Sequence, residues 1–90
     1  MNNYQFELGE TRVTVYAKDR IGVTKVMKSI NNHQKGMYGA IDEDIVEKNN
    51  ENIEKNSGKV ISEHLIEDET LRIVTDLTKE TTRATCLIKY

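Results

Sequence analysis

One stretch near the middle of the chain reads GMYGAIDEDI and brings together two glycines, an aromatic side chain and three consecutive carboxylates. The carboxylates of Asp42, Glu43 and Asp44 have the chemistry to bind a metal ion. Consecutive residues of a helical turn diverge by ~100° each, so three in a row do not converge on one ion. The EF-hand spacing also fails, because Val46 and Glu47 stand where it requires an oxygen ligand and a glycine. We therefore predict no metal site here.

Helix capping is the other chemistry open to these carboxylates. Asp is a favoured N-cap residue, and acidic side chains in a first turn interact well with the helix dipole and the free N–H groups. Asp42 is therefore the predicted N-cap, with Glu43 and Asp44 in the first turn. Tyr38, which precedes them, is predicted to pack in the turn that leads into this helix.

His33, His64 and Cys86 are the other side chains suited to metal binding or acid–base chemistry. No two of them lie at the spacing of a motif such as HxxxH or CxxC. A nucleophilic pair of Cys86 and His64 is the enzymatic alternative, but a histidine and a cysteine in strands are usually packed or surface residues. We predict that the chain is not an enzyme, has no catalytic residues and uses no cofactor.

Two helices that would position these residues are predicted from apolar periodicity. The first has the i, i+3, i+4, i+7 pattern and ends near His33 or Gly36; its apolar residues are Val23, Val26, Met27 and Ile30. The second runs from about Asp42 to Asn56, and its inner face recurs at intervals of four residues: Ile41, Ile45, Asn49 and Ile53. On that face Asn49 is expected to bond backbone groups of a neighbouring strand or loop; a ligand-binding role is the alternative.

Period-two alternation predicts the strands. Residues 4–8 and 13–17 alternate on either side of Gly9-Glu10, which suggests an N-terminal β-hairpin. After the second helix, KVISEHLI, TLRIVTDL and TRATCLIKY predict a three-stranded antiparallel meander joined by short polar turns. The expected fold is α+β, in the order ββααβββ, with two helices on one face of an antiparallel sheet and a single domain spanning residues 1–90.

Composition limits the class of protein further. Ninety residues make one small domain, and the single cysteine cannot form an internal disulfide, which fits a cytoplasmic setting. No segment approaches the ~20 apolar residues of a membrane span.

Charge is unevenly distributed along the chain. Residues 1–36 carry six Lys/Arg and three Asp/Glu, residues 37–70 carry three Lys/Arg and ten Asp/Glu, and residues 71–90 carry four Lys/Arg and two Asp/Glu. The acidic middle argues against nucleic-acid binding over a continuous basic face and suits a basic protein partner.

Part of that acidity forms a row on the second predicted helix. The residues fall at i, i+4, i+8 and i+11, opposite the isoleucines: Glu43, Glu47, Glu51 and Glu54. A rise of about 6 Å per four residues is close to the ~7 Å between successive phosphates of a nucleic-acid strand, so the row is able to occupy a basic channel. Lys48 and Lys55 beside the row favour the alternative of a solvated helix face.

Several stretches, in the same order, resemble a family of small uncharacterised proteins carried on plasmids, conjugative elements and phages. The family reads approximately LG, then GDWGxLDxED, an Asn, GxRxxSxY and ITExDRxxTTxLLPEEY. The matching residues here are Leu8-Gly9, Gly36–Asp44, Asn49, Gly58–Ser62, Ile73–Asp76 and Thr78–Thr82. Tyr38 stands where the family has Trp, and the closing LLPEEY is CLIKY here. The resemblance brings no enzymatic activity with it.

What the resemblance implies is an accessory protein of mobile DNA, and such proteins often bind a host defence machine such as a CRISPR effector or a restriction enzyme. The first hypothesis is thus a non-enzymatic anti-defence inhibitor, for instance an anti-CRISPR. Its expected contact surface comprises Tyr38, Asp42, Glu43, Glu47, Glu51, Glu54, Glu67, Asp68 and Glu69. The second hypothesis is a nucleic-acid-binding regulator that uses Arg12, Lys18, Arg20, Lys25 and Lys28. An exposed strand edge would also allow a homodimer.

Overall fold

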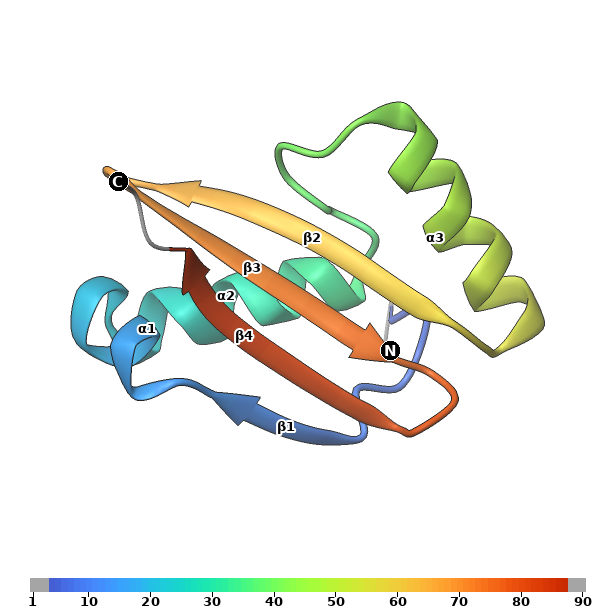
Figure 1. Cartoon of the computed structure of the whole chain (residues 1–90), viewed down its shortest axis with the longest axis horizontal. Coiled ribbons are helices and arrows are strands. Elements are labelled where there is room, and N and C mark those ends of the chain that lie inside the picture. The colour runs from blue at the N-terminus through green and yellow to red at the C-terminus, as the bar shows by residue number, and fades with distance from the viewer. Residues whose placement is uncertain (1–3, 88–90) are drawn as a thin grey trace.

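The computed structural model describes residues 4–87, in which a four-stranded sheet carries helices on one face and along one edge (Figure 1). The elements in chain order are β1 (Glu10–Val13), α1 (Val15–Ile21), α2 (Val23–Gln34), α3 (Glu43–Lys55), β2 (Lys59–Ile66), β3 (Glu69–Asp76) and β4 (Thr81–Leu87). The strand order across the sheet is β1-β4-β3-β2. The α+β class is confirmed, but the sheet is mixed rather than antiparallel, since β1 runs parallel to β4.

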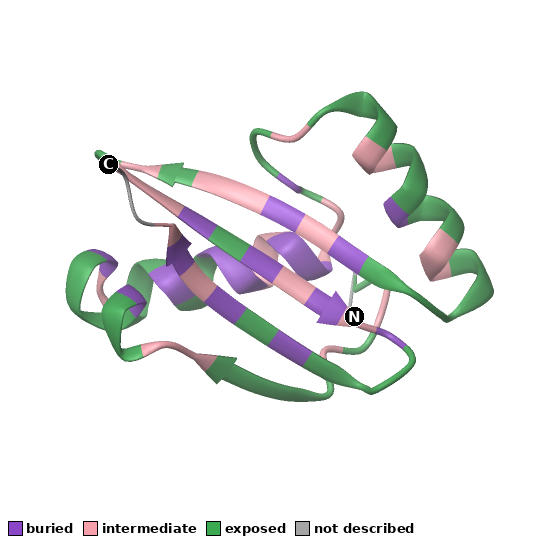
Figure 2. Ribbon diagram, viewed as in Figure 1, coloured by how far each residue is buried: buried purple, intermediate pink, exposed green. Residues whose placement is uncertain are grey.

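The C-terminal meander is confirmed. β2 pairs antiparallel with β3, and β3 pairs antiparallel with β4. Buried residues alternate with exposed or half-buried residues along β3 and β4 (Figure 2). This alternation follows from the pleat, which sends successive side chains to opposite faces of the sheet.

The predicted N-terminal hairpin is wrong. Within residues 4–17 only Glu10–Val13 forms a strand, and it pairs in parallel with the first half of β4. Gly9 does not reverse the chain; it has φ +67°, and a Cβ there would lie 1.9 Å from the carbonyl oxygen of Glu80. Gly9 therefore allows the backbone to pass close to the start of β4 and enter the sheet at its edge.

A helix takes the place of the second hairpin arm. Thr14 is its N-cap, and its hydroxyl accepts a hydrogen bond from the Ala17 N–H at 3.2 Å. Ala17 and Ile21, four residues apart, are the buried residues of this helix, α1. Gly22, with φ +98°, separates α1 from α2, so the observed order is βαααβββ.

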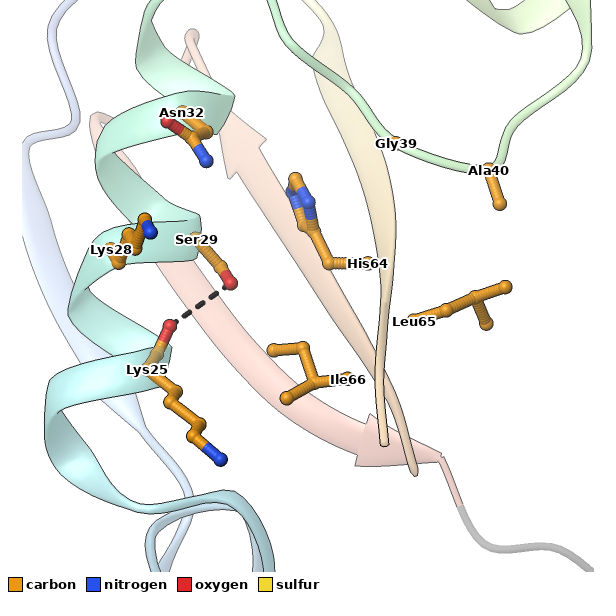
Figure 3. A pocket seen from close by; sticks show the side chains of 9 residues that line it. All are labelled: Lys25, Lys28, Ser29, Asn32, Gly39, Ala40, His64, Leu65 and Ile66. Carbon is orange, nitrogen blue, oxygen red and sulfur yellow. Dashed lines mark hydrogen bonds between the residues drawn. The ribbon is translucent and has the colours of Figure 1, made fainter. Parts of the chain in front are cut away.

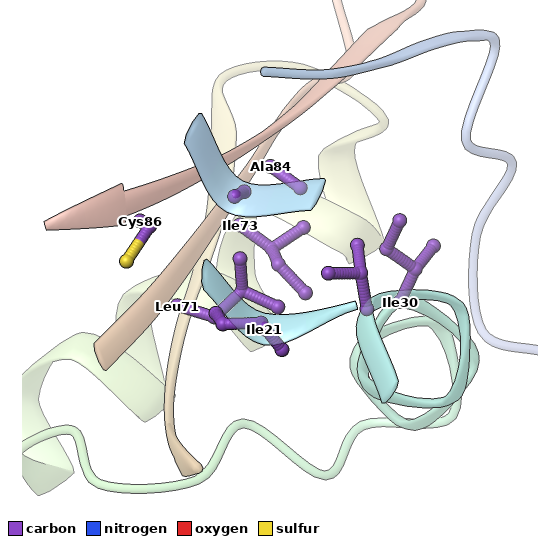
Figure 4. Packing of buried hydrophobic residues seen from close by; sticks show 8 residues of the cluster. Ile21, Ile30, Leu71, Ile73, Ala84 and Cys86 are labelled. Carbon is purple, nitrogen blue, oxygen red and sulfur yellow. The ribbon is translucent and has the colours of Figure 1, made fainter. Parts of the chain in front are cut away.

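Helices α1 and α2 cover the apolar face of β3 and β4. The cluster that they bury consists of Ala17, Ile21, Val26, Ile30, Leu71, Ile73, Ala84 and Cys86 (Figure 4). Burial of these side chains is the main favourable contribution to folding, at roughly 25 cal/mol per Å² of apolar surface. The first predicted helix is confirmed as α2, and two residues of its predicted stripe, Val26 and Ile30, lie in this cluster. The other two predicted positions are wrong, because Val23 and Met27 are 58% and 51% exposed.

The second predicted helix is confirmed as α3, which packs against β2 at the edge of the sheet (Figure 1). Asp42 occupies the N-cap position with extended backbone angles, but its side chain makes no capping hydrogen bond. Asn56, with φ 54°, ends the helix in the left-handed conformation. A smaller apolar cluster lies beneath α3, formed by Tyr38, Val60 and Leu77 with Phe6, Ile41, Val46 and Ile53 packed around them. Across residues 4–87 no helix has the length and apolar character needed to span a membrane.

Candidate functional site

The exposed side of α3 presents a row of carboxylates, which we call the acidic face: Asp42, Glu43, Glu47, Glu51 and Glu54. All five are exposed to solvent. Lys48 lies beside the row and pairs with Glu51 at 3.7 Å. Because both side chains of this pair are more than half exposed, it contributes little to stability and leaves the face predominantly negative.

Asn49 holds α3 against the sheet. Its Nδ2 donates to the Ile61 carbonyl at 2.8 Å, and its Oδ1 accepts from the Ile61 N–H at 2.9 Å. Asn49 thus bonds both backbone groups of Ile61, as a residue of a neighbouring strand would. The predicted bond from Asn49 to strand backbone is confirmed. Asn52 adds a bond from its Nδ2 to the Lys59 carbonyl at 2.8 Å. The acidic face therefore stands on a helix whose position is specified at two points of β2.

The other acidic residues predicted for the contact surface lie elsewhere. Glu67, Asp68 and Glu69 are at the turn between β2 and β3, beside the start of α2 and away from α3 (Figure 1). Glu67 forms an ion pair with Lys25, which lowers the pKa of that carboxyl, and Glu69 lies 3.8 Å from Arg20. The predicted single surface is thus two separate regions.

Tyr38 requires a correction as a contact residue. Its side chain is only 5% exposed, so it offers a partner almost no surface. It packs in the small cluster with Val60 and stands edge-on to His33, with ring centroids 6.1 Å apart. Its packed position agrees with the other prediction made for it. Its hydroxyl is buried and has no hydrogen-bond partner in the described part of the chain.

The basic residues of the second hypothesis come from β1, α1 and α2. Arg12 pairs with Glu10 at 2.8 Å, and Arg20 stacks over the Tyr16 ring at 5.1 Å in addition to its contact with Glu69. Together with the Lys25–Glu67 pair, these contacts place an acid beside three of the five cations. Lys18 and Lys28 form no ion pair with any residue in the range 4–87.

A buried row of hydrogen-bonded side chains crosses the sheet, and sequence reasoning missed it. We call it the polar seam; it comprises His33 of α2, Ser62 and His64 of β2, Thr75 of β3 and Thr82 of β4. The bonds join His64 Nε2 to Ser62 Oγ (3.0 Å), Ser62 Oγ to His33 Nδ1 (2.7 Å), His33 Nε2 to Thr75 Oγ1 (2.9 Å), and Thr75 Oγ1 to Thr82 Oγ1 (2.8 Å). Thr82 then donates to the carbonyl of Leu8 at 2.6 Å.

Both histidines of the seam are held neutral. Burial, and to a smaller extent the nearby imidazole of His64, lowers the pKa of His33 to about 3. Burial also lowers the pKa of His64. A charged imidazole loses its hydration here, whereas a neutral one fits a row of hydroxyl groups with one donor and one acceptor nitrogen.

Cys86 and His64 are not brought together. The register pairs His64 with Leu71 and Leu71 with Cys86, so the two residues lie two strands apart, or about 10 Å. Cys86 is buried, and its Sγ contacts a carboxylate oxygen of Glu69 at 3.2 Å. The enzymatic alternative therefore lacks its nucleophile–base contact. Over residues 4–87 no three His, Cys, Asp or Glu side chains form a group able to hold a metal ion.

A pocket of about 560 Å³ opens between α2 and the second half of β2 (Figure 3). Its wall on α2 is polar, and its wall on β2 and the loop before α3 combines apolar groups with one imidazole. The lining residues are Lys25, Lys28, Ser29, Asn32, Gly39, Ala40, His64, Leu65 and Ile66. The pocket therefore meets the polar seam at His64.

The chain matches no protein-family model, no curated protein and no solved structure in comparisons with known proteins.

Proposed function

We propose that this is a non-enzymatic binding protein whose acidic face engages the basic surface of a partner protein. The proposed partner is a nucleic-acid-processing complex of a host defence system, a CRISPR effector or a restriction enzyme, which the protein inhibits by occupying its nucleic-acid channel. The observation that carries this proposal is the exposed carboxylate row on α3, held in place through the hydrogen bonds of Asn49 to Ile61.

Charge and rigidity support the proposal. The segment from Asp42 to Lys55 contains six Asp/Glu and two Lys, so its formal charge is −4. Such a surface raises the rate of encounter with a basic channel and is sensitive to salt. Because α3 is fixed to β2 before binding, little conformational entropy is lost when the row meets its partner.

The context of the partner comes from the resemblance to proteins of mobile DNA. A defence nuclease has a basic channel that normally holds DNA or RNA, and a helix with carboxylates about 6 Å apart presents charge at nearly the spacing of phosphates. Complementary charge then steers the protein toward such a channel.

The test is complex formation between the protein and candidate effectors at increasing salt. We expect affinity to fall steeply with salt, and the double variant Glu47→Lys/Glu51→Lys to bind at least about tenfold more weakly. The matched control is Glu7→Lys/Asp19→Lys, which changes charge equally on exposed residues outside α3. Binding that resists both salt and the α3 variant would contradict the proposal.

A gel shift separates the proposal from the nucleic-acid-binding alternative. The acidic-face proposal predicts that the protein alone does not shift random duplex or single-stranded DNA or RNA. A shift that weakens with salt and with Lys18→Gln/Lys28→Gln would instead favour the basic residues as the functional surface.

A further inference from the structure

The polar seam has a fixed direction of hydrogen bonding, set at its Leu8 end. A carbonyl oxygen only accepts, so the hydroxyl of Thr82 donates its single hydrogen to Leu8. Thr82 must then accept the bond from Thr75, which uses the hydrogen of Thr75. Thr75 in turn accepts from His33, so Nε2 of His33 carries the proton.

The same reasoning continues to the other end of the seam. Neutral His33 has its proton on Nε2, which leaves Nδ1 as an acceptor for the hydroxyl of Ser62. Ser62 has then spent its hydrogen and accepts from Nε2–H of His64. His64 is therefore the Nε2–H tautomer, and its Nδ1 carries a lone pair. Because the Leu8 carbonyl can only accept, the donor and acceptor of all five bonds are determined, including the tautomer of His64 at the far end.

That lone pair borders the pocket at Gly39. A Cβ at Gly39 would lie 3.2 Å from Nδ1 of His64 and 2.2 Å from the carbonyl oxygen of Glu63. Because residue 39 is glycine, no side chain at this position covers Nδ1 of His64. Gly39 itself forms a β-bridge with Glu63 of β2. Both Gly39 and His64 line the pocket.

The facing wall on α2 supplies positive charge and hydrogen-bond donors. Lys28 has no ion-pair partner among residues 4–87. The side-chain amide of Asn32 likewise has no hydrogen bond within that range. Ser29 donates to the Lys25 carbonyl at 3.0 Å, so its hydroxyl has only acceptor capacity left. In Figure 3 Lys28 and Asn32 lie on α2 across from His64.

We propose that this pocket binds a small organic anion that also carries an O–H or N–H donor. The anionic group lies against Lys28 and Asn32, the donor bonds Nδ1 of His64, and the apolar body rests on Leu65 and Ile66. The pocket volume of about 560 Å³ is within the usual range for small-molecule sites. A ligand with an acceptor in place of the donor would oppose the lone pair of His64 and is rejected.

Matched probes test both halves of this chemistry. The carboxylate arm compares 4-hydroxybenzoate with 4-methoxybenzoate, and the phosphate arm compares 4-hydroxyphenyl phosphate with 4-methoxyphenyl phosphate. Each would be titrated against ¹⁵N-labelled protein at pH 7 by NMR. We expect one or both hydroxy probes to shift the amides of Gly39 and His64 saturably, with the methoxy probe at least about tenfold weaker. Lys28→Gln should weaken binding about tenfold, whereas Lys18→Gln, an exposed lysine on α1, should not.

The ¹⁵N shifts of the His64 ring test the tautomer without any ligand. We expect a protonated Nε2 and an unprotonated Nδ1 in the free protein, and a change at Nδ1 when a hydroxy probe binds. A proton on Nδ1 would overturn the assigned direction of the seam. Failure of both hydroxy probes to bind, or equal binding of hydroxy and methoxy probes, would overturn the proposed ligand class. Neither result depends on the acidic face.

Discussion

The two halves of α2 cover the same face of the sheet in different ways. The first half buries Val26, with Ile30 just beyond it, in a cluster with Leu71 and Ile73, an apolar contact with no directional requirement (Figure 4). The second half places His33, 0% exposed, on hydroxyl groups of β2 and β3. An apolar cluster tolerates exchange of one apolar side chain for another of similar volume, whereas each hydrogen bond of the seam needs a donor opposite an acceptor. The comparison indicates that the apolar half provides most of the stability and the polar half fixes the register of α2 over the strands.

The largest effect is expected in the apolar half. Leu71→Ala removes a fully buried side chain from β3 and leaves a cavity, so we expect a loss of about 2–5 kcal/mol in the free energy of unfolding. Urea denaturation followed by circular dichroism measures it. Leu65→Ala on the adjacent strand is the matched control, because Leu65 is 69% exposed and its truncation should cost less than about 0.5 kcal/mol. Equal losses at the two positions would contradict the assignment of the core.

The next effect belongs to the polar half and depends on pH. The pKa of His33 falls from 6.5 in the unfolded chain to about 3 in the fold, so between these values the unfolded state binds more protons. The stabilisation is fully present above pH 6.5 and is lost as pH falls toward 3, with a slope approaching about 1.4 kcal/mol per pH unit from this residue. Unfolding free energies at pH 7, 6, 5 and 4 measure it.

The lowered pKa of His64 adds to the same slope, so His64→Gln should reduce the slope and leave the part of it that burial of His33 causes. Leu71→Ala should keep the slope of the parent protein, because it removes apolar contacts alone. A flat profile between pH 6.5 and 5 would show that His33 is not held neutral. In that window the carboxylates of an unfolded chain have largely lost their protons already.

A smaller effect is expected where a polar side chain meets an edge strand rather than a buried row. Asn49→Ala removes both bonds to the backbone N–H and C=O of Ile61, and water can replace only part of them, so we expect a loss of about 1–2 kcal/mol. Asn52→Ala removes one bond to Lys59 from a less buried side chain and should cost less. Hydrogen exchange at the Ile61 amide would report the same change locally. A larger loss for Asn52 than for Asn49 would contradict the anchoring role.

The smallest effect is expected at a hydroxyl that lies outside the seam. The Tyr38 hydroxyl is buried without a partner, so Tyr38→Phe should change stability by less than about 0.5 kcal/mol or raise it. Thr75→Val deletes a buried hydroxyl that bonds both His33 and Thr82, and should cost about 1–3 kcal/mol. Thermal unfolding of the two variants compares them directly. Similar losses for the two variants would show that the hydrogen bonds of the seam do not contribute more to stability than an unbonded buried hydroxyl.

Part of the fold is predictable from local sequence. Apolar residues recur with a period of two in the meander strands and of close to four in α2 and α3, which predicts these elements. Asn49 is recognisable as an amide on an otherwise apolar stripe. The N-terminal region was misread because residues 13–17 alternate, while the cap at Thr14 and the spacing of Ala17 and Ile21 favour a helix. No local pattern encodes β1, because its parallel pairing with β4 joins residues about seventy positions apart in the chain.

The site is less predictable, for a physical reason. Ser62 and Thr75 resemble ordinary exposed strand residues until β2 and β3 are placed under α2. His33 falls at i+3 and i+7 from Ile30 and Val26, which is the signal that could have indicated a buried imidazole. Which hydroxyl groups meet it depends on the register of three strands, and that is a tertiary property.

The contacts along the outer side of β2 have a consequence for how copies of the chain can assemble. The loop before α3 bonds both backbone groups of Glu63, at 3.0 and 2.7 Å, and Asn49 does the same at Ile61. These groups substitute for a fifth strand, while β1 pairs on one side alone within the described residues. We expect any second copy to add along β1, and such a pairing would occupy this edge in both copies. We therefore expect a self-associated form built through β1 to contain two chains.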